Sequence, residues 1–242
     1  PIWRLIPSLS DHISYLIELR EERSKQVFFY FLNDSFHLKK IDILLDWWIG
    51  VEAVVAQNVI FHGFLQQDLP IHSGIKVWDA EKNEWKWENE FLSLVNIEGE
   101  TIWAKNSLGS TDTLLTVELH TGNRTDQVPK DNKTSLPVAN IITKDQPYFA
   151  EIAFFISQYT PYQPTDYLEY LETPAHIIVS YFVKNKKKYN NYLLVTSSCG
   201  DELLHICLHE GCNGFAAGTF HVSNALLSFV KDKKEVFIVA LQ

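Results

Sequence analysis

The sequence predicts an α+β fold in which helices accompany largely antiparallel sheets, arranged as two strand-rich meanders. Three observations predict it: helical spacing of apolar residues near the N-terminus, a change to alternating spacing after Ile75, and turn residues at short intervals in the C-terminal half. Hydrophobic residues make up 46% and charged residues 21% of the 242 residues. This composition is enough to build a core, and it excludes global disorder.

Helices are predicted in two places before residue 60. Between 10 and 25 the apolar residues recur at the spacing of one helix face. The aromatic run 27–32 then predicts a buried strand. A second helix is predicted from 36 to 57, although Gly50 weakens it. The apolar tract 41–65 carries acidic residues, so it indicates a buried helix and not a membrane span.

Strands are predicted from Ile75 onward. Residues 75–78 and 84–87 form a hairpin around 79–83. Further strands of this meander are predicted at 91–97, 101–105 and 113–120. The proline-containing polar stretch 121–147 predicts a loop or linker, since unstructured connections of this length are uncommon inside a domain.

The C-terminal part predicts a second meander. Its strands are expected at 176–183, 192–197, 203–209, 215–222 and 235–241, and Lys184 to Lys188 forms a solvated hairpin tip. Short helices are predicted at 166–172 and 224–230, while the apolar segment 148–159 carries no assignment. The predicted division is a helix-then-sheet lobe (1–120), a loop or linker (121–147) and a second strand-rich lobe (148–242). A single continuous domain is the alternative.

Charge and cysteine content narrow the class of protein. The net charge of −9 disfavours a general nucleic-acid binder. Three cysteines cannot all pair within the chain, and the sequence shows neither a signal peptide nor a spanning segment. These features predict an intracellular protein, cytoplasmic or nuclear, without a membrane partner.

The stretch from Cys199 to Cys212 holds all three cysteines and is the nearest thing to a chemical signature. If 203–210 is a strand, His205, Cys207 and His209 share one face. With Cys212 they offer thiolate and imidazole ligands of the kind that zinc prefers, but their spacing matches no standard zinc motif. Buried structural residues are therefore the favoured interpretation, and the sequence indicates neither a metal nor another cofactor.

Cys199 is also the best candidate for a nucleophile. It follows an apolar strand in a small turn with Gly200, where backbone amides could face an oxyanion. His176, His205 or His221 could serve as its base. The sequence lacks the common nucleotide-binding, hydrolase and metalloprotease motifs.

Trp85 and Trp87 are the candidate binding residues, because two residues apart on a strand they share a face. Exposed, such a pair would anchor a partner; buried, it would be core. Together with the missing motifs, this predicts a non-catalytic binding or assembly module with a protein partner. The alternatives are a cysteine-dependent hydrolase using Cys199 and a small structural zinc site around Cys207. The sequence does not identify a small-molecule substrate.

Overall fold

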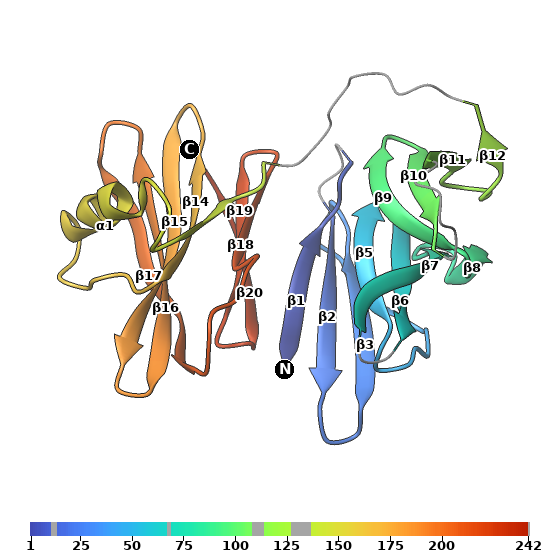
Figure 1. Ribbon diagram of the computed structural model, residues 1–242, viewed down its shortest axis with the longest axis horizontal. Coiled ribbons are helices and arrows are strands. Elements are labelled where there is room, and N and C mark those ends of the chain that lie inside the picture. Colours follow the sequence, from blue (N-terminus) through green and yellow to red (C-terminus); the bar gives the residue numbers. More distant parts are fainter. Residues whose placement is uncertain (11–13, 67–68, 108–113, 127–136, 242) are drawn as a thin grey trace. The chain divides into compact units, whose positions relative to one another are not determined.

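The computed structural model describes residues 1–10, 14–66, 69–107, 114–126 and 137–241. Within these ranges it contains twenty strands and one helix, α1 (Phe149–Ser157), and is nearly all-β (Figure 1). The α+β prediction is therefore wrong. The prediction of antiparallel sheets is confirmed, because the named strands pair antiparallel in five sheets of three to five strands. No helix among the described residues is both long and apolar enough to span a membrane.

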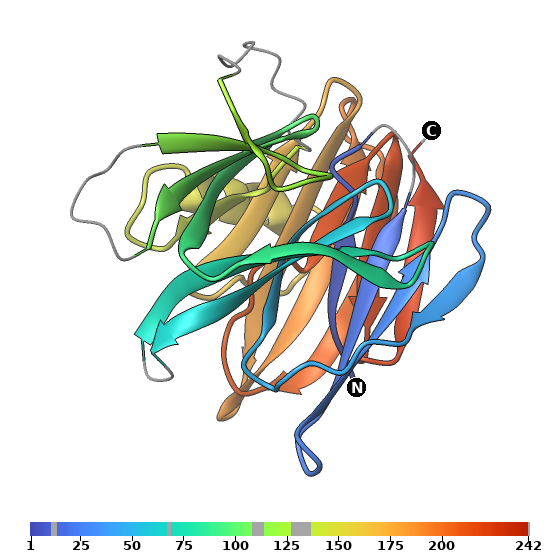
Figure 2. The same cartoon turned by 90° about the vertical axis from the view of Figure 1, so that its right-hand side faces the viewer.

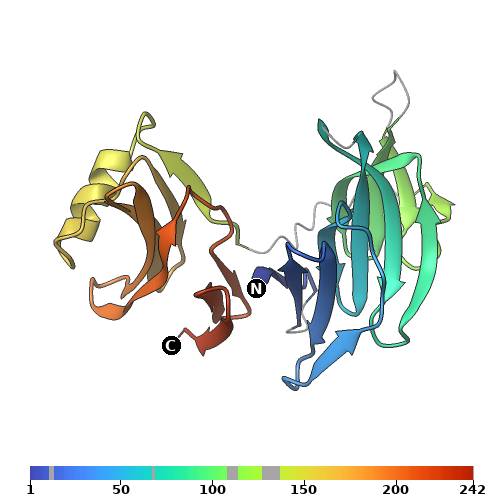
Figure 3. The same cartoon turned by 90° about the horizontal axis from the view of Figure 1, so that it is seen from below.

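The chain divides into two units, residues 1–135 and 136–242. The first holds three four-stranded meanders, each pairing its strands in chain order, and Figure 3 shows them one after another in blue, cyan and green. Their strands are β1 (Ile2–Pro7), β2 (Tyr15–Glu21), β3 (Gln26–Leu32), β4 (Leu38–Ile41), β5 (Gly50–Val55), β6 (Asn58–Gln66), β7 (Leu69–Asp79), β8 (Glu84–Asn89), β9 (Leu92–Glu98), β10 (Thr101–Asn106), β11 (Leu114–Glu118) and β12 (Arg124–Thr125).

The second unit holds a five-stranded and a three-stranded meander. Its strands are β13 (Asn140–Thr143), β14 (Tyr167–Glu172), β15 (His176–Asn185), β16 (Lys188–Ser197), β17 (Glu202–Cys212), β18 (Phe220–Ser223), β19 (Leu226–Lys231) and β20 (Glu235–Ala240). The long strands β15, β16 and β17, orange in Figure 2, form the body of the larger sheet. Helix α1 packs on this sheet through Phe149, Ile152 and Ile156.

The middle sheet of the first unit, β5–β8, is buried on both faces. One face packs with β2 and β3 in a cluster that includes Phe29, Val54 and Phe61. The other packs with β9, β10 and β11 around Val55 and Ile60. A strand between two cores has apolar residues on both sides and loses the alternation that reveals a half-buried strand.

This double burial explains why the residues of β5 resemble part of a helix. The segment predicted as a helix over 36–57 contains β4 and β5, and its valines at 51, 54 and 55 suit a pleated strand better than a helix. Positive φ angles at Phe36 (57°) and Ala56 (50°) mark turns where a helix would continue. Within the helix predicted over 10–25, residues 15–21 form β2, whose consecutive buried residues imitate a helical face. Residues 11–13 of that prediction lie outside the described residues.

The short helices predicted at 166–172 and 224–230 are also wrong, since these residues form β14 and β19. The hairpin around 79–83 is confirmed as β7–β8, and the lysine-rich tip is confirmed as the turn between β15 and β16. The strands predicted at 27–32, 176–183 and 203–209 are confirmed, whereas 215–222 is strand only from Phe220. The segment 121–147 holds the boundary between the units and also the two short strands β12 and β13.

Candidate functional site

Cys199 lies exposed in the turn between β16 and β17. Gly200 adopts φ +95°, and its carbonyl accepts a 2.8 Å hydrogen bond from the Tyr159 hydroxyl. The hydroxyl of Ser197 accepts a hydrogen bond from the amide of Asp201 at 3.0 Å and closes the turn. The turn is therefore held by the Ser197 hydroxyl within it and by Tyr159, which follows α1.

His205, the candidate base, is engaged elsewhere. Its Nε2 lies 2.7 Å from the Tyr181 hydroxyl, and its ring stacks near the tyrosine ring at a centroid distance of 6.1 Å. Burial lowers the pKa of His205, with a smaller opposing contribution from the charge of Glu202. The Cys199–His205 arrangement thus gains no support from the hydrogen bonds of the described residues.

The expectation that His205, Cys207 and His209 share one face is wrong. In the pairing of β16 with β17, Tyr192 lies opposite Cys207 but the next residue, Asn191, lies opposite His209. Leu208 is therefore the extra residue of a β-bulge, and such a bulge reverses the side on which the following residue projects. His209 faces away from the other two.

The thiol of Cys212 lies 3.8 Å from the carbonyl oxygen of His209, which is a weak backbone contact and not a shared ligand position. Burial raises the pKa of both Cys207 and Cys212, which favours the neutral thiol over the metal-binding thiolate. The described residues of this strand do not bring their donor atoms together as a metal site requires.

A second bulge separates the two candidate tryptophans. Trp85 lies opposite Trp78, whereas Trp87 lies opposite Val77, so Lys86 is the extra residue and the expectation of one shared face is wrong. Trp85 packs edge-on against Trp78 at 4.9 Å and keeps 42% of its surface exposed. Trp87 turns to the other face, where its indole N–H donates to the carbonyl of Leu119 at 2.8 Å.

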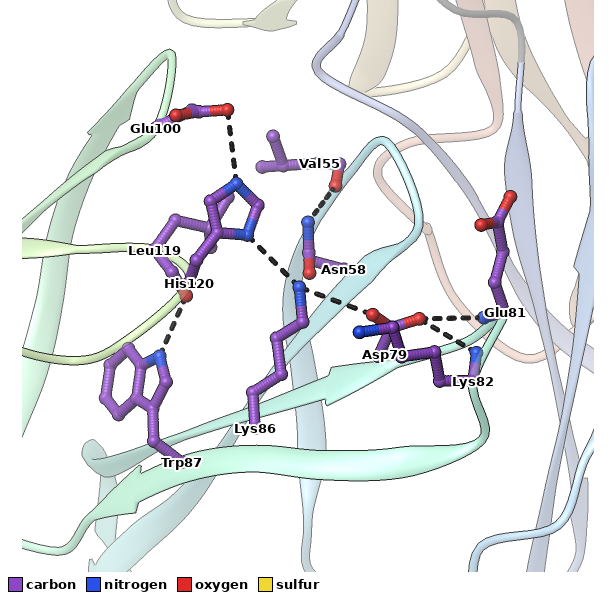
Figure 4. A network of polar contacts seen from close by, with 10 residues as sticks. All are labelled: Val55, Asn58, Asp79, Glu81, Lys82, Lys86, Trp87, Glu100, Leu119 and His120. Carbon is purple, nitrogen blue, oxygen red and sulfur yellow. Dashed lines mark hydrogen bonds and ion pairs between the residues drawn. The ribbon is translucent and has the colours of Figure 1, made fainter.

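Lys86, the bulged residue, links two sheets through the polar network drawn in Figure 4. Its ammonium lies 3.3 Å from the Asp79 carboxylate and donates to Nδ1 of His120 at 3.1 Å. Since Nδ1 accepts, His120 carries its proton on Nε2, which donates to Glu100. Burial by itself would raise the pKa of Asp79. The hydrogen bonds from backbone amides and the positive charge of Lys86 have a larger effect, so the pKa of Asp79 is lowered. We therefore interpret the network as a link that holds the two sheets together.

Replacement of each tryptophan by alanine is therefore expected to change the free energy of unfolding by a different amount. Trp87→Ala is expected to lower the free energy of unfolding by about 2–3 kcal/mol, because it removes packing and leaves the Leu119 carbonyl without its donor. Trp85→Ala is expected to cost about 1 kcal/mol, since much of that ring is already exposed. Urea midpoints of the two variants measure the difference. Equal shifts would contradict the assignment of the rings to opposite faces.

The candidate ligand site is a cleft of about 560 Å³ in the second unit. It lies between the edge strand β13, the neighbouring β14 and the first turn of α1. A volume of this size suits a side chain or a small molecule. The residues that line it are Asn140, Ile141, Ile142, Gln146, Pro147, Tyr148, Glu151, Ile152, Tyr170 and Glu172.

The cleft owes its shape to the entry of the chain into α1. Gln146 closes a turn by accepting a hydrogen bond from the amide of Thr143 at 2.8 Å. Tyr148 then takes a left-handed conformation, φ 73°, and stays 68% exposed at the helix start. Because Ile152 on the following turn is buried against the sheet, the helix leaves Glu151 on the cleft side.

The charged residues that line the cleft are acidic. Its walls are mainly apolar or aromatic, and among the described residues the charged groups that line it are the carboxylates of Glu151 and Glu172. The Tyr170 hydroxyl donates to Glu172 Oε2 at 2.8 Å, which orients that carboxylate. Burial raises the pKa of Tyr170 to about 12, and the hydrogen bond to Glu172 and the charge of Glu172 add to this effect. The tyrosine therefore remains a donor at neutral pH.

Sequence reasoning missed this cleft. The prolines around 166–172 suggested a helix there, although Tyr170 and Glu172 are strand residues two apart. The spacing of Phe149, Ile152 and Ile156 is the one signal that would have indicated a helix in the unassigned segment. The approach of Glu151 to β14 depends on long-range packing that the sequence does not display.

Comparison with known proteins gives little information about function beyond what the chain's own residues provide. The model of a family described as a domain of unknown function (DUF4905) matches residues 10–87, about a third of the chain. No curated protein matches.

Solved structures with some similarity include the β-propeller domain of the Trilobed protease from Pyrococcus furiosus, with 12% identity and a TM-score of 0.33, over 93% of this chain and 75% of that one. Another is the acylaminoacyl peptidase of Pyrococcus horikoshii, with 13% identity and a TM-score of 0.29, over 98% of this chain and 38% of that one. Meanders of four strands are also the sheets from which propellers are built. Similarity at this level leaves function to be argued from the chain's own side chains.

Proposed function

We propose that this chain is a non-catalytic binding module that receives a basic side chain of a protein partner in the cleft beside α1. The observation that carries the proposal is the composition of the cleft, whose described lining residues provide apolar walls and two carboxylates but no basic side chain. A lysine or arginine side chain matches this composition, because its stem is apolar and only its end is charged.

The energetics favour such a ligand over a neutral or anionic one. The stem would bury apolar surface against Ile141 and Ile152, and the ammonium or guanidinium would interact with Glu151 and Glu172. Both carboxylates are exposed, so they contribute mainly selectivity and association rate, and salt should weaken binding. A single side chain gives modest affinity, and a partner would add contacts along its backbone.

Matched peptides test the proposal. The probe is an acetylated, amidated pentapeptide with lysine between glycines, compared with analogues that carry norleucine or glutamate at the same position. Amide chemical shifts of the isotope-labelled protein should respond to the lysine peptide at Ile141, Ile142 and Ile152, less to norleucine and least to glutamate.

Variants locate the interaction. Glu172→Gln and Glu151→Gln should each weaken lysine-peptide binding several-fold, and the double variant about tenfold. Glu210→Gln, an exposed change elsewhere in the same unit, is the matched control. Melting temperatures monitor α1, because Glu151 lies in its first turn. If the unaltered protein bound the glutamate peptide as tightly as the lysine peptide, the proposal would be wrong whatever the variants show.

A further inference from the structure

Three adjacent strands of the sheet β5–β8 each present one side chain that can bind a metal ion: Glu52, His62 and His72. One donor atom from each lies within 4.8 Å of the donor atoms of the other two. Among the residues the structure describes, this is the single group of histidine, cysteine, aspartate or glutamate side chains that converges in this way. The cluster belongs to the first unit, whereas the cysteines and the cleft belong to the second.

The backbone is shaped to seat the first imidazole. Gly50 of β5 lies directly opposite His62 of β6. A Cβ atom on residue 50 would approach the Nε2 atom of His62 to 2.3 Å, so a glycine is needed for the ring to lie over the neighbouring strand. Glu52 is the extra residue of a bulge between Val51 and Ala53, which turns its carboxylate out of the regular alternation.

The hydrogen bonds fix both imidazoles in the same tautomer. Nδ1 of His62 lies 2.9 Å from the carbonyl oxygen of Gly63, and Nδ1 of His72 lies 2.7 Å from Oε1 of Glu52. A carbonyl and a carboxylate oxygen only accept, so each neutral ring carries its proton on Nδ1 and has its lone pair on Nε2. Metal-binding histidines are oriented by this type of partner, a backbone carbonyl or a carboxylate.

The two rings are neighbours, and they differ in exposure. They stack with centroids 3.6 Å apart and planes inclined by 25°, and the ring of Phe64 meets both edge-on. His62 is 5% exposed, whereas the side chain of His72 is 45% exposed. The cluster is thus closed by protein on one side and open to solvent on the other, which provides an entry path for an ion.

We propose that Glu52, His62 and His72 bind a divalent transition-metal ion of the zinc class, each through one donor atom. Imidazole with a carboxylate is a donor set that suits such ions and not the oxygen-preferring Ca²⁺ or Mg²⁺. Zinc–nitrogen bonds of about 2.0–2.1 Å require the stacked rings to turn toward one ion, a movement that the 45% exposed His72 side chain allows. Solvent would complete the coordination.

Titration with Zn²⁺ and Co²⁺ tests the inference on the full chain. Calorimetry should give one site per chain, and Co²⁺ should produce visible d–d absorption that Zn²⁺ abolishes. His62→Ala and His72→Ala should each weaken binding by about 100-fold, and Glu52→Gln by about 10-fold or more. His37→Ala is the matched control, because it removes an exposed histidine from the same unit and should leave the affinity unchanged. Gly50→Ala should weaken binding without removing a donor atom.

The cysteines provide the competing outcome. A thiolate-to-cobalt charge-transfer band in the near ultraviolet that disappears in Cys212→Ser and persists in His62→Ala would place the ion on β17 and overturn the inference. The absence of saturable binding, or equal affinity for Ca²⁺, would overturn it as well. Circular dichroism of each variant confirms that its sheets are intact, so a loss of binding reflects the site.

Discussion

Glu18→Ala is expected to lower the free energy of unfolding of the first unit by about 3–5 kcal/mol. Glu18 is fully buried on β2, and its two oxygens accept hydrogen bonds from Arg4 at 2.9 Å and from Arg20 at 2.5 Å. Arg20 is only 12% exposed and also donates to the carbonyls of Trp47 and Ile49. Removal of the carboxylate leaves a nearly buried guanidinium without its counter-charge.

Urea denaturation measures this effect. Glu22→Ala, an exposed glutamate in the turn that follows the same strand, is the matched control and should change stability by less than about 0.5 kcal/mol. Glu18→Gln should lower the free energy of unfolding by less than Glu18→Ala but by more than Glu22→Ala, since an amide keeps one acceptor oxygen but loses the charge. A loss below about 1 kcal/mol for Glu18→Ala would show that the arginines rearrange to reach water.

Glu169→Ala is expected to destabilise the second unit by about 3–4 kcal/mol, for a different reason. This buried carboxylate on β14 has neutral partners: it accepts hydrogen bonds from the amides of Gly218 and Thr219, at 2.5 and 3.0 Å, and from the Thr219 hydroxyl at 2.5 Å. Glu169 therefore attaches the chain before β18 to the larger sheet. Its removal leaves the amides of Gly218 and Thr219 without this acceptor, whereas the Thr219 hydroxyl still lies 2.7 Å from the Ser180 hydroxyl.

Two measurements separate this role from general destabilisation. Amide hydrogen exchange in Glu169→Ala should accelerate most at Gly218 and Thr219, and less in the centres of β15 and β16. Glu169→Gln should also be destabilising, because one of its two terminal atoms would become a donor facing a donor. Glu235→Ala, an exposed glutamate on β20, is the control. Unchanged exchange at Gly218 and Thr219 would show that other contacts hold this segment.

Much of the strand content could be predicted where one face of a strand is more exposed than the other. The β7–β8 and β15–β16 hairpins were predicted because turn or charged residues separate two β-rich runs. Prediction failed for β2 and β5, whose apolar residues occur on both faces. Local spacing cannot separate such a strand from a buried helix, because the second covering layer comes from distant parts of the chain.

The candidate sites depended still more on tertiary structure. The chemical groups, the acidic balance of charge and the hairpins with locally marked turns can all be read from the order of the amino acids. Which of those groups meet depends on how distant strands pair and pack. Bulges at Leu208 and Lys86 separated residues that strict alternation had placed together, while strand pairing brought Glu52, His62 and His72 together and the packing of α1 placed Glu151 in a cleft with Glu172. The physical reason is that a single inserted residue reverses a strand's faces, and its position is set by pairing with a neighbouring strand.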